Sequence, residues 1–346
     1  MELDTEHGGT SPTTMRAVQM IGRGGYDQLV ISNDVPVPRA GPGEVLIRVG
    51  AAGVNNTDIN TRIGWYGADA GWSGDVPIYP RIQGADACGV IVATGSGVPA
   101  SRIGARVLVE PVFRDASGTA RYFGSEVDGA FADYAVVPSQ HAHSIVSTLT
   151  DIELASFPCS YSAAENMVVR SAVGSGERVL VTGASGGVGS AAVQLARRRG
   201  AEVVAVAGED KHAAILGIGA TEVVDRAADL VARFGSDSFD VVIDVVGGPG
   251  WPALLHVLRP RGRYAVAGAI AGAEVKLDLR VLYLKDLRLL GCTVLDDGVF
   301  AGLVAAIERG ELQPLVAATF PLTDIVAAQE LFLTKRHVGK IVLDGA

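Results

Sequence analysis

Short apolar runs that alternate with polar residues dominate the first 150 residues of the chain. They fall at residues 16–20, 44–49, 89–94, 106–109 and 131–137, and Pro and Gly separate several of them. Such alternation, bounded by turn residues, is typical of half-buried β-strands. Residues 62–79 predict a loop that carries Trp65, Tyr66, Trp72 and Tyr79 among several glycines. The first part of the chain is therefore predicted to be rich in β-structure.

After residue 151 the pattern changes, because nearly continuous apolar runs alternate with segments of helical periodicity. The predicted strands are 178–182, 202–207, 222–224, 239–246, 262–267 and 286–293. The predicted helices are 154–170, a helix that ends at 199, 211–218, 228–234 and 252–258. This alternation indicates a parallel sheet with crossover helices on both faces. Residues 300–346 predict two further helices and a last strand at 340–343.

A glycine-rich turn joins the first of these later strands to an alanine-rich helix. Its residues are Gly183, Ala184, Ser185, Gly186, Gly187, Val188 and Gly189. Small residues let the backbone approach a pyrophosphate, and the N-terminus of the following helix offers unpaired N–H groups to it. Because a strand precedes the turn and a helix follows it, this order predicts a dinucleotide site. A tight turn that binds no ligand is the alternative.

Composition and charge narrow the class of protein. Hydrophobic residues make up 48% of the 346 residues, and no apolar run has the length of a membrane-spanning helix. The formal net charge of −9 argues against nucleic-acid and anionic-membrane partners. The cysteines Cys88, Cys159 and Cys292 are far apart and odd in number, so we expect a reducing, cytoplasmic environment. Residues 1–14 lack the features of a signal peptide and are predicted to form a mobile tail.

Several motifs follow one another along the chain in a characteristic order. They are Gly53-Val54-Asn55-Asn56-Thr57-Asp58, Arg62 with Gly64-Trp65-Tyr66, residues 84–90, 129–134 and 184–189, and Gly339-Lys340-Ile341-Val342. Together they resemble the medium-chain dehydrogenase/reductase superfamily, and within it the zinc-independent quinone oxidoreductase-like group. The resemblance implies an α/β fold with a Rossmann doubly wound parallel sheet domain at 151–295. It also implies a β-rich, partly barrel-like GroES-like catalytic domain at 15–150 and 296–346, and a homodimer or homotetramer.

Most of the residues that hold zinc in zinc-dependent members of the superfamily are missing. By the resemblance, Asn55 and Ala85 stand where those members have Cys and His, and only Cys159 keeps a ligand type. A catalytic zinc needs at least three protein ligands, so we predict that no metal is bound. His141 and His143 are two residues apart, and we expect solvated or hydrogen-bonded histidines there rather than a metal pair.

The residues after the second Rossmann strand bear on the choice of cofactor. A carboxylate at the end of the strand 202–207 would favour NAD, but none stands there. Lys211 follows where the quinone-reductase relatives place a lysine against the 2′-phosphate, and Arg226 could add a second positive charge. Glu209 and Asp210 weaken this inference, and Lys211 could also be an exposed residue that opens a helix. We predict NADPH, bound by Ser162, Ala184, Ser185, Gly186, Gly187, Val188, Gly208, Lys211, Arg226, Val245, Val246, Gly268, Ala269 and Lys340.

Hydride transfer to a quinone, or to the β-carbon of an α,β-unsaturated carbonyl, needs less help from a Lewis acid than alcohol oxidation does. By the resemblance, Asn55, Asp58, Arg62 and Tyr66 border the nicotinamide end and are the candidate catalytic residues. Tyr66 is the first candidate for a hydrogen bond to the substrate, and Arg62 could stabilise negative charge. Structural roles are the alternatives: Tyr66 can cap the cleft, Arg62 can pair with Asp58, and Asn55 can hold a turn.

Two further functions fit the same residues. One is an enoyl-thioester reductase, and the other is a non-catalytic NADPH-binding or redox-sensing protein. Asn60 stands where relatives have another tyrosine, so the pocket is more polar there. The identity of the substrate therefore stays open. The sequence alone does not separate the three functions.

Overall fold

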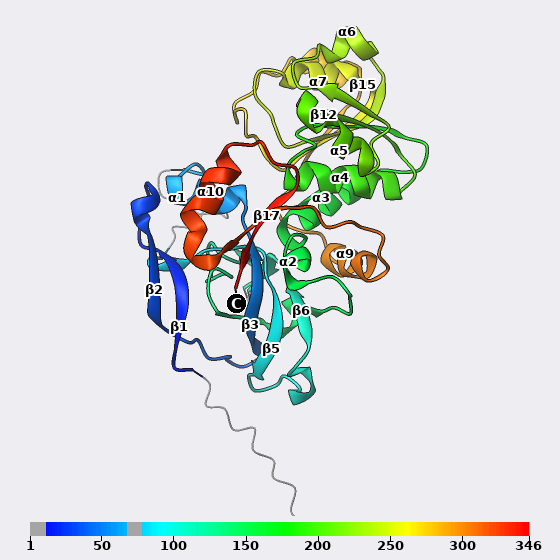
Figure 1. Ribbon diagram of the computed structural model, residues 1–346. Coiled ribbons are helices and arrows are strands. Elements are labelled where there is room, and N and C mark those ends of the chain that lie inside the picture. The colour runs from blue at the N-terminus through cyan, green and yellow to red at the C-terminus, as the bar shows by residue number, and fades with distance from the viewer. Residues whose placement is uncertain (1–11, 68–77, 116, 346) are drawn as a thin grey trace, which may run out of the picture.

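The computed structural model describes residues 12–67, 78–115 and 117–345. A β-rich part formed by both ends of the chain lies beside a parallel sheet flanked by helices (Figure 1). Most of the predicted tail, residues 1–11, and the part of the predicted loop that holds Trp72 lie outside the described residues. The first strand, β1 (Thr14–Met20), starts on the last residue of that predicted tail.

The β-rich part contains a large mixed sheet in the strand order β10-β6-β5-β3-β18-β17, with β9 also paired to β3. Its strands are β3 (Glu44–Gly53), β5 (Cys88–Thr94), β6 (Arg106–Val109), β9 (Tyr134–Pro138), β10 (Ala142–Ser144), β17 (Val316–Pro321) and β18 (Lys340–Asp344). Two smaller sheets pair β1 with β2 (Leu29–Pro36) and β4 (Arg81–Ile82), and β7 (Val112–Arg114) with β8 (Ala120–Tyr122). Since β18 pairs with β3, the end of the chain returns to its beginning.

The second sheet is parallel throughout, in the order β13-β12-β11-β14-β15-β16. Its strands are β11 (Arg178–Val181), β12 (Glu202–Ala207), β13 (Glu222–Asp225), β14 (Phe239–Asp244), β15 (Leu258–Val266) and β16 (Arg288–Gly291). The strand order reverses at β11, and ligands of doubly wound sheets bind at the carboxyl ends of the strands beside such a switch point. The predicted fold class is confirmed, whereas the proposed domain boundaries stay predictions.

Helices cover both faces of the parallel sheet. One hydrophobic core lies under α3 (Pro158–Arg170), α4 (Gly187–Arg198), α5 (His212–Gly217) and α9 (Val299–Glu308). The other lies under α6 (Leu230–Phe234), α7 (Trp251–Val257) and α8 (Leu279–Leu284). The first core continues through Phe157 into Ala51, Cys88 and Leu108 of the β-rich part. The two parts therefore share packed apolar side chains.

Several predicted elements needed correction. Helix α1 (Asn56–Ile63) lies where we predicted no helix, and β17 lies in a segment that predicted helices. β9 starts at Tyr134 rather than 131, and β15 starts at Leu258, inside the predicted helix 252–258. The remaining helices are α2 (Asp151–Leu154) and α10 (Ile325–Leu333). Within the described ranges, every helix is too short or too polar to cross a bilayer.

The polar sequence of α1 explains why its periodicity is weak. The backbone N–H of Asn55 donates to Asp58 Oδ2 at 2.7 Å, and Gly64 ends the helix with a left-handed φ of 74°. Caps of this kind satisfy backbone groups that a short helix leaves unpaired. Local capping and tertiary packing, rather than an apolar stripe, therefore stabilise α1.

Gly189 lets the first turn of α4 pack against the glycine-rich turn. A Cβ at Gly189 would lie 2.2 Å from the Gly183 carbonyl oxygen, whereas a Cβ at Gly186 would lie 3.5 Å from that same atom. We expect Gly189→Ala to lower the free energy of unfolding by about 1–3 kcal/mol, because the backbone must move to admit the methyl group. Gly186→Ala is the matched control and should stay within about 0.5 kcal/mol of wild type. Urea unfolding measures both, and equal stability of the two variants would contradict the close packing.

Candidate active site

The glycine-rich turn leaves the carboxyl end of β11 and enters α4. Gly183 has a left-handed φ of 59°, and its carbonyl oxygen accepts a hydrogen bond from Gly186 N–H at 3.0 Å. The turn thus places Ala184, Ser185 and Gly186 at the switch point of the parallel sheet. This is the position that a dinucleotide pyrophosphate requires.

The loops after β14 and β15 gather beside this turn. Asp244, which is fully buried, accepts hydrogen bonds from Val246 N–H at 2.9 Å and from the Tyr264 hydroxyl at 2.5 Å. Burial and the neighbouring Asp244 carboxylate raise the pKa of Tyr264. Gly268 approaches Val245 so closely that a Cβ there would lie 3.3 Å from the Val245 carbonyl oxygen. The structure therefore brings Val245, Val246, Gly268 and Ala269 to the same edge of the sheet as the turn.

Of the two predicted phosphate-binding cations, only Lys211 contacts the turn. Its Nζ donates to Ser185 Oγ at 3.4 Å and to the Lys335 carbonyl oxygen at 2.5 Å. Gly208 follows the end of β12, and Glu209 and Asp210 are exposed. Arg226 is also exposed, and its side chain contacts none of the predicted cofactor residues in the described structure.

A buried polar cluster lies where the β-rich part meets α3. Lys340 Nζ donates to Val54 O at 3.0 Å, to Asn55 Oδ1 at 2.5 Å and to Asp86 Oδ2 at 2.7 Å. Asn55 Nδ2 also donates to Asp86 Oδ2, and Cys159 N–H donates to Asp86 Oδ1 at 2.5 Å. An ammonium has three N–H donors, and all three are used. A direct contact from Lys340 Nζ to a cofactor would need one of these bonds to break.

Asp58, Cys159 and Tyr66 surround this cluster. Burial raises the pKa of Asp58 to about 7, and it also raises the pKa of the Cys159 thiol. Burial likewise raises the pKa of Tyr66, whose hydroxyl lies beside Thr57 and Asn60. Ser162 faces back along α3, because its hydroxyl donates to Cys159 O at 3.2 Å. Asn55, Asp58 and Tyr66 thus lie close together, and their place at the nicotinamide end stays a prediction.

Thr57 is a residue that the sequence reasoning missed. Its Oγ1 is buried and lies beside the Tyr66 hydroxyl. The only local signal was its place beside Asp58 in the first turn of α1, which was not predicted as a helix. Thr57 therefore offers a hydroxyl within reach of the Tyr66 phenol.

The side chain of Arg62 forms its hydrogen bonds outside this cluster. Its guanidinium donates to Gly24 O at 2.8 Å and to Gln329 Oε1 at 3.0 Å, and it lies 4.5 Å from the centroid of the Tyr26 ring. Only 3% of the residue is exposed. The structure therefore holds Arg62 between the loop after β1 and α10, and it does not show the pairing with Asp58 that was an alternative.

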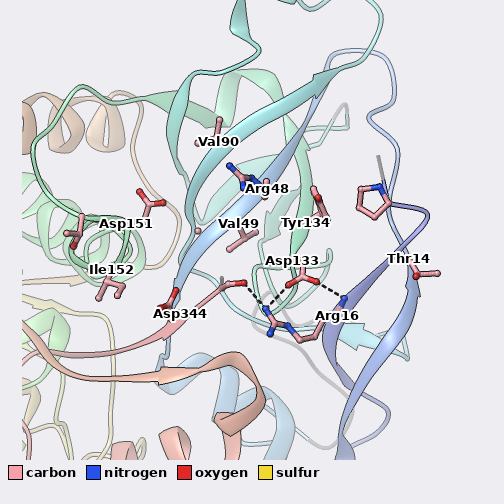
Figure 2. A pocket seen from close by; sticks show the side chains of 14 residues that line it. Thr14, Arg16, Arg48, Val49, Val90, Asp133, Tyr134, Asp151, Ile152 and Asp344 are labelled. Carbon is pink, nitrogen blue, oxygen red and sulfur yellow. Dashed lines mark hydrogen bonds and ion pairs between the residues drawn. The ribbon is translucent and has the colours of Figure 1, made fainter. Parts of the chain in front are cut away.

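A hollow of about 600 Å³ lies away from these residues, between β1, β3 and α2. Figure 2 shows Arg48, Val49 and Ile152 around it. On one wall, Arg16 donates to Asp133 Oδ1 at 2.9 Å and to the Gly345 carbonyl oxygen at 2.7 Å (Figure 2). None of the predicted site residues lines this hollow, so it belongs to the packing of the chain end.

Comparison with known proteins agrees with this arrangement. Residues 41–147 match the alcohol dehydrogenase GroES-like domain, and residues 187–309 match the zinc-binding dehydrogenase family. Quinone oxidoreductase of Rattus norvegicus is 30% identical, over 96% of this chain and 99% of that protein. The chain belongs to the medium-chain dehydrogenase/reductase superfamily. Within this superfamily, it falls in the quinone oxidoreductase-like group.

Other members of the superfamily show the range of activities. Acryloyl-coenzyme A reductase of Metallosphaera sedula is 29% identical over 95% of this chain and 99% of that protein. The structure of a proposed alcohol dehydrogenase from Sinorhizobium meliloti 1021 is 46% identical, with a TM-score of 0.90 and coverage of 97% and 98%. The structure of the crotonyl-CoA carboxylase/reductase AntE in complex with NADP is 25% identical, with a TM-score of 0.84 and coverage of 98% and 96%.

The donors near Cys159 do not fit the zinc site that the family description implies. Asn55 offers an amide already bonded to Lys340 and Asp86, and Ala85 offers no donor at all. The Lys340 ammonium already neutralises Asp86 there. Across the described ranges, no three His, Cys, Asp or Glu side chains are placed to hold a metal ion.

His141 and His143 instead share one carboxylate. Both contact Glu110 Oε2, at 2.8 and 3.2 Å. Burial alone would raise the pKa of Glu110, but the hydrogen bonds from the histidines bring it below its ordinary value. This agrees with the expectation of hydrogen-bonded histidines.

Lys340 is expected to be essential for the stability of the site. Lys340→Met leaves the Asp86 carboxylate buried without a counter-charge, which costs about 3–5 kcal/mol for pairs of this kind. Urea unfolding measures the loss, and adding Asp86→Asn to the same protein should recover part of it. Arg280→Met, which removes an exposed pair with Asp278, is the control and should leave stability unchanged within error. A Lys340→Met protein as stable as wild type would contradict the assigned role.

Proposed function

We propose that this oxidoreductase transfers a hydride from NADPH to a quinone or to an α,β-unsaturated carbonyl, without zinc. The observation that carries the proposal is the cluster of Asn55, Asp86, Cys159 and Lys340, whose donor set does not fit zinc. Its neighbour Tyr66 offers a proton donor at the same junction. A bound NADPH supplies the hydride, and the protein supplies orientation and hydrogen bonds to the acceptor.

Tyr66 is the residue that we assign to the acceptor oxygen. Because burial raises its pKa, the phenol stays protonated at neutral pH and can donate to a developing enolate or quinol oxygen. The buried Thr57 hydroxyl lies beside Tyr66 and can donate a second hydrogen bond to the acceptor oxygen. Asn55 and Asp58 act indirectly, since they hold the start of α1 on which Thr57 lies.

NADPH is favoured over NADH by the surroundings of Lys211. Its Nζ contacts Ser185 of the turn, and neither Ala207, where β12 ends, nor the following Gly208 offers a carboxylate to a ribose hydroxyl. A 2′-phosphate forms strong charge-assisted hydrogen bonds with such a cation. The AntE complex with NADP supports this choice by analogy.

An enoyl-thioester reductase is the second candidate. It is favoured by the likeness to acryloyl-coenzyme A reductase over nearly the full chain. It needs the same hydride and the same oxygen donor, and differs in requiring recognition of the CoA portion. The third candidate is a non-catalytic NADPH-binding or redox-sensing protein. It would use the same cofactor-binding residues as the two enzymes.

Turnover assays distinguish these functions. We expect the wild type to oxidise NADPH faster than NADH with a quinone and an enone, with no need for a CoA group and no loss after treatment with a chelator. Tyr66→Phe should lower kcat about 100-fold without changing the affinity for NADPH, because only the acceptor contact is lost. Tyr134→Phe, which lies in the distant hollow of Figure 2, is the control and should leave kcat unchanged. Binding of NADPH with no turnover of any acceptor, or turnover abolished by a chelator, would contradict the proposal.

We also propose a homodimer or homotetramer built through the edge strand β16. Its second edge pairs with no strand among the described residues, and the adjacent α8 exposes Leu279, Tyr283 and Leu284. Exposed apolar side chains beside an unpaired strand favour association with a second copy. Leu284→Asp should yield a 35.7 kDa monomer by light scattering, whereas the wild type should be larger. A monomeric wild type would overturn this assembly.

The cytoplasmic location stays a prediction.

A further inference from the structure

The loop between α10 and β18 brings positive charge from the GroES-like part of the chain to the glycine-rich turn. Gly339 N–H donates to the Ser185 carbonyl oxygen at 3.0 Å, so the end of the loop is anchored on the turn. The Lys335 carbonyl oxygen accepts a hydrogen bond from Lys211 Nζ at 2.5 Å. Two points of contact therefore fix this loop over the turn.

The Lys335 ammonium lies on the α1 side of the same junction. Its Nζ donates to Asn56 Oδ1 at 3.0 Å and lies 3.7 Å from the centroid of the Phe332 ring. Within the described ranges, neither Lys335 nor Lys211 forms an ion pair with a carboxylate. The Lys211 ammonium at the turn and the Lys335 ammonium on the α1 side of the junction therefore both lack a carboxylate counter-charge among the described residues.

Burial lowers the pKa values of two basic side chains in this region. Burial lowers the pKa of Lys335 to about 8. Burial, together with the charges of Lys335, Lys211 and Lys340, lowers the pKa of His337 to about 4. His337 Nδ1 is also buried without a hydrogen-bond partner in the described structure. An anion bound here would offset the positive potential that these groups share.

The backbone of Lys335 is strained as well. Its φ is 53°, in the left-handed region that a residue with a Cβ adopts only at a cost. Lys335 follows Thr334, the C-cap of α10, at the position where a left-handed residue commonly ends a helix. Here it directs the carbonyl oxygen toward Lys211 while the ammonium reaches Asn56.

We propose that Lys335 binds the pyrophosphate of the nicotinamide dinucleotide and closes it against the glycine-rich turn. The inference rests on the proposed dinucleotide site and adds a residue that the motif does not contain. Lys335 Nζ lies toward α1 and the nicotinamide end, whereas Lys211 lies at the end of β12, where the adenosine ribose of such cofactors is bound. Lys335 therefore serves the pyrophosphate common to NADPH and NADH, and Lys211 serves the 2′-phosphate.

Calorimetric titration of the full chain with NADPH and with NADH tests this division. Lys335→Met should raise the Kd for both dinucleotides about tenfold, because one charge-assisted hydrogen bond is lost from each complex. Lys335→Arg should restore most of the affinity. Lys211→Met should weaken NADPH alone, and Lys276→Met, which removes an exposed lysine near α8, should change neither Kd.

Lys335→Gly separates binding from folding. It relieves the left-handed φ, so its Tm should equal or exceed that of the wild type while both Kd values rise. Lys335→Met with unchanged Kd values, or with a loss confined to NADPH, would overturn the assignment while leaving the proposed activity intact. A wild type that binds neither dinucleotide would overturn both the assignment and the proposed function.

Discussion

The buried ion pair between Asp86 and Lys340 is the interaction on which the candidate site depends. Only 2% of Lys340 is exposed and none of Asp86, so both charges have lost their hydration. Burial on this scale is tolerated only when every charge is paired and hydrogen-bonded. Here both Asp86 oxygens and all three Lys340 donors are satisfied, by the residues between β3 and α1 and by the start of α3.

This pair also explains why the chain must return to its first domain. Strand β18 supplies Lys340, and the loop before it supplies Gly339, which binds the glycine-rich turn through Ser185. The turn belongs to the parallel sheet, whereas β18 belongs to the sheet of the β-rich part. One short segment thus fixes the cofactor edge relative to α1 and Tyr66, and it positions the junction where we place the reaction.

Local patterns were enough to predict much of the fold. Apolar runs set the parallel strands, and small residues between a strand and a helix located the turn at Gly183 to Gly189. These patterns can be recognised from the sequence alone because they depend on residues that are neighbours along the chain. The segments that were missed lack such a signal: α1 is polar and held by its caps, and β17 alternates only between half-buried and exposed residues. Their conformation is decided by what packs against them.

The sequence by itself determined the fold class, the family and the place of the glycine-rich turn, since each depends on residue types in a local order. The tertiary structure alone decided what the charged side chains do. Lys340 meets Asp86 across 254 positions, and Arg62 meets Gln329 across 267. Lys335 reaches Asn56 from the other end of the chain. No local pattern encodes these partners, because burial and charge compensation are properties of the assembled core rather than of any single segment.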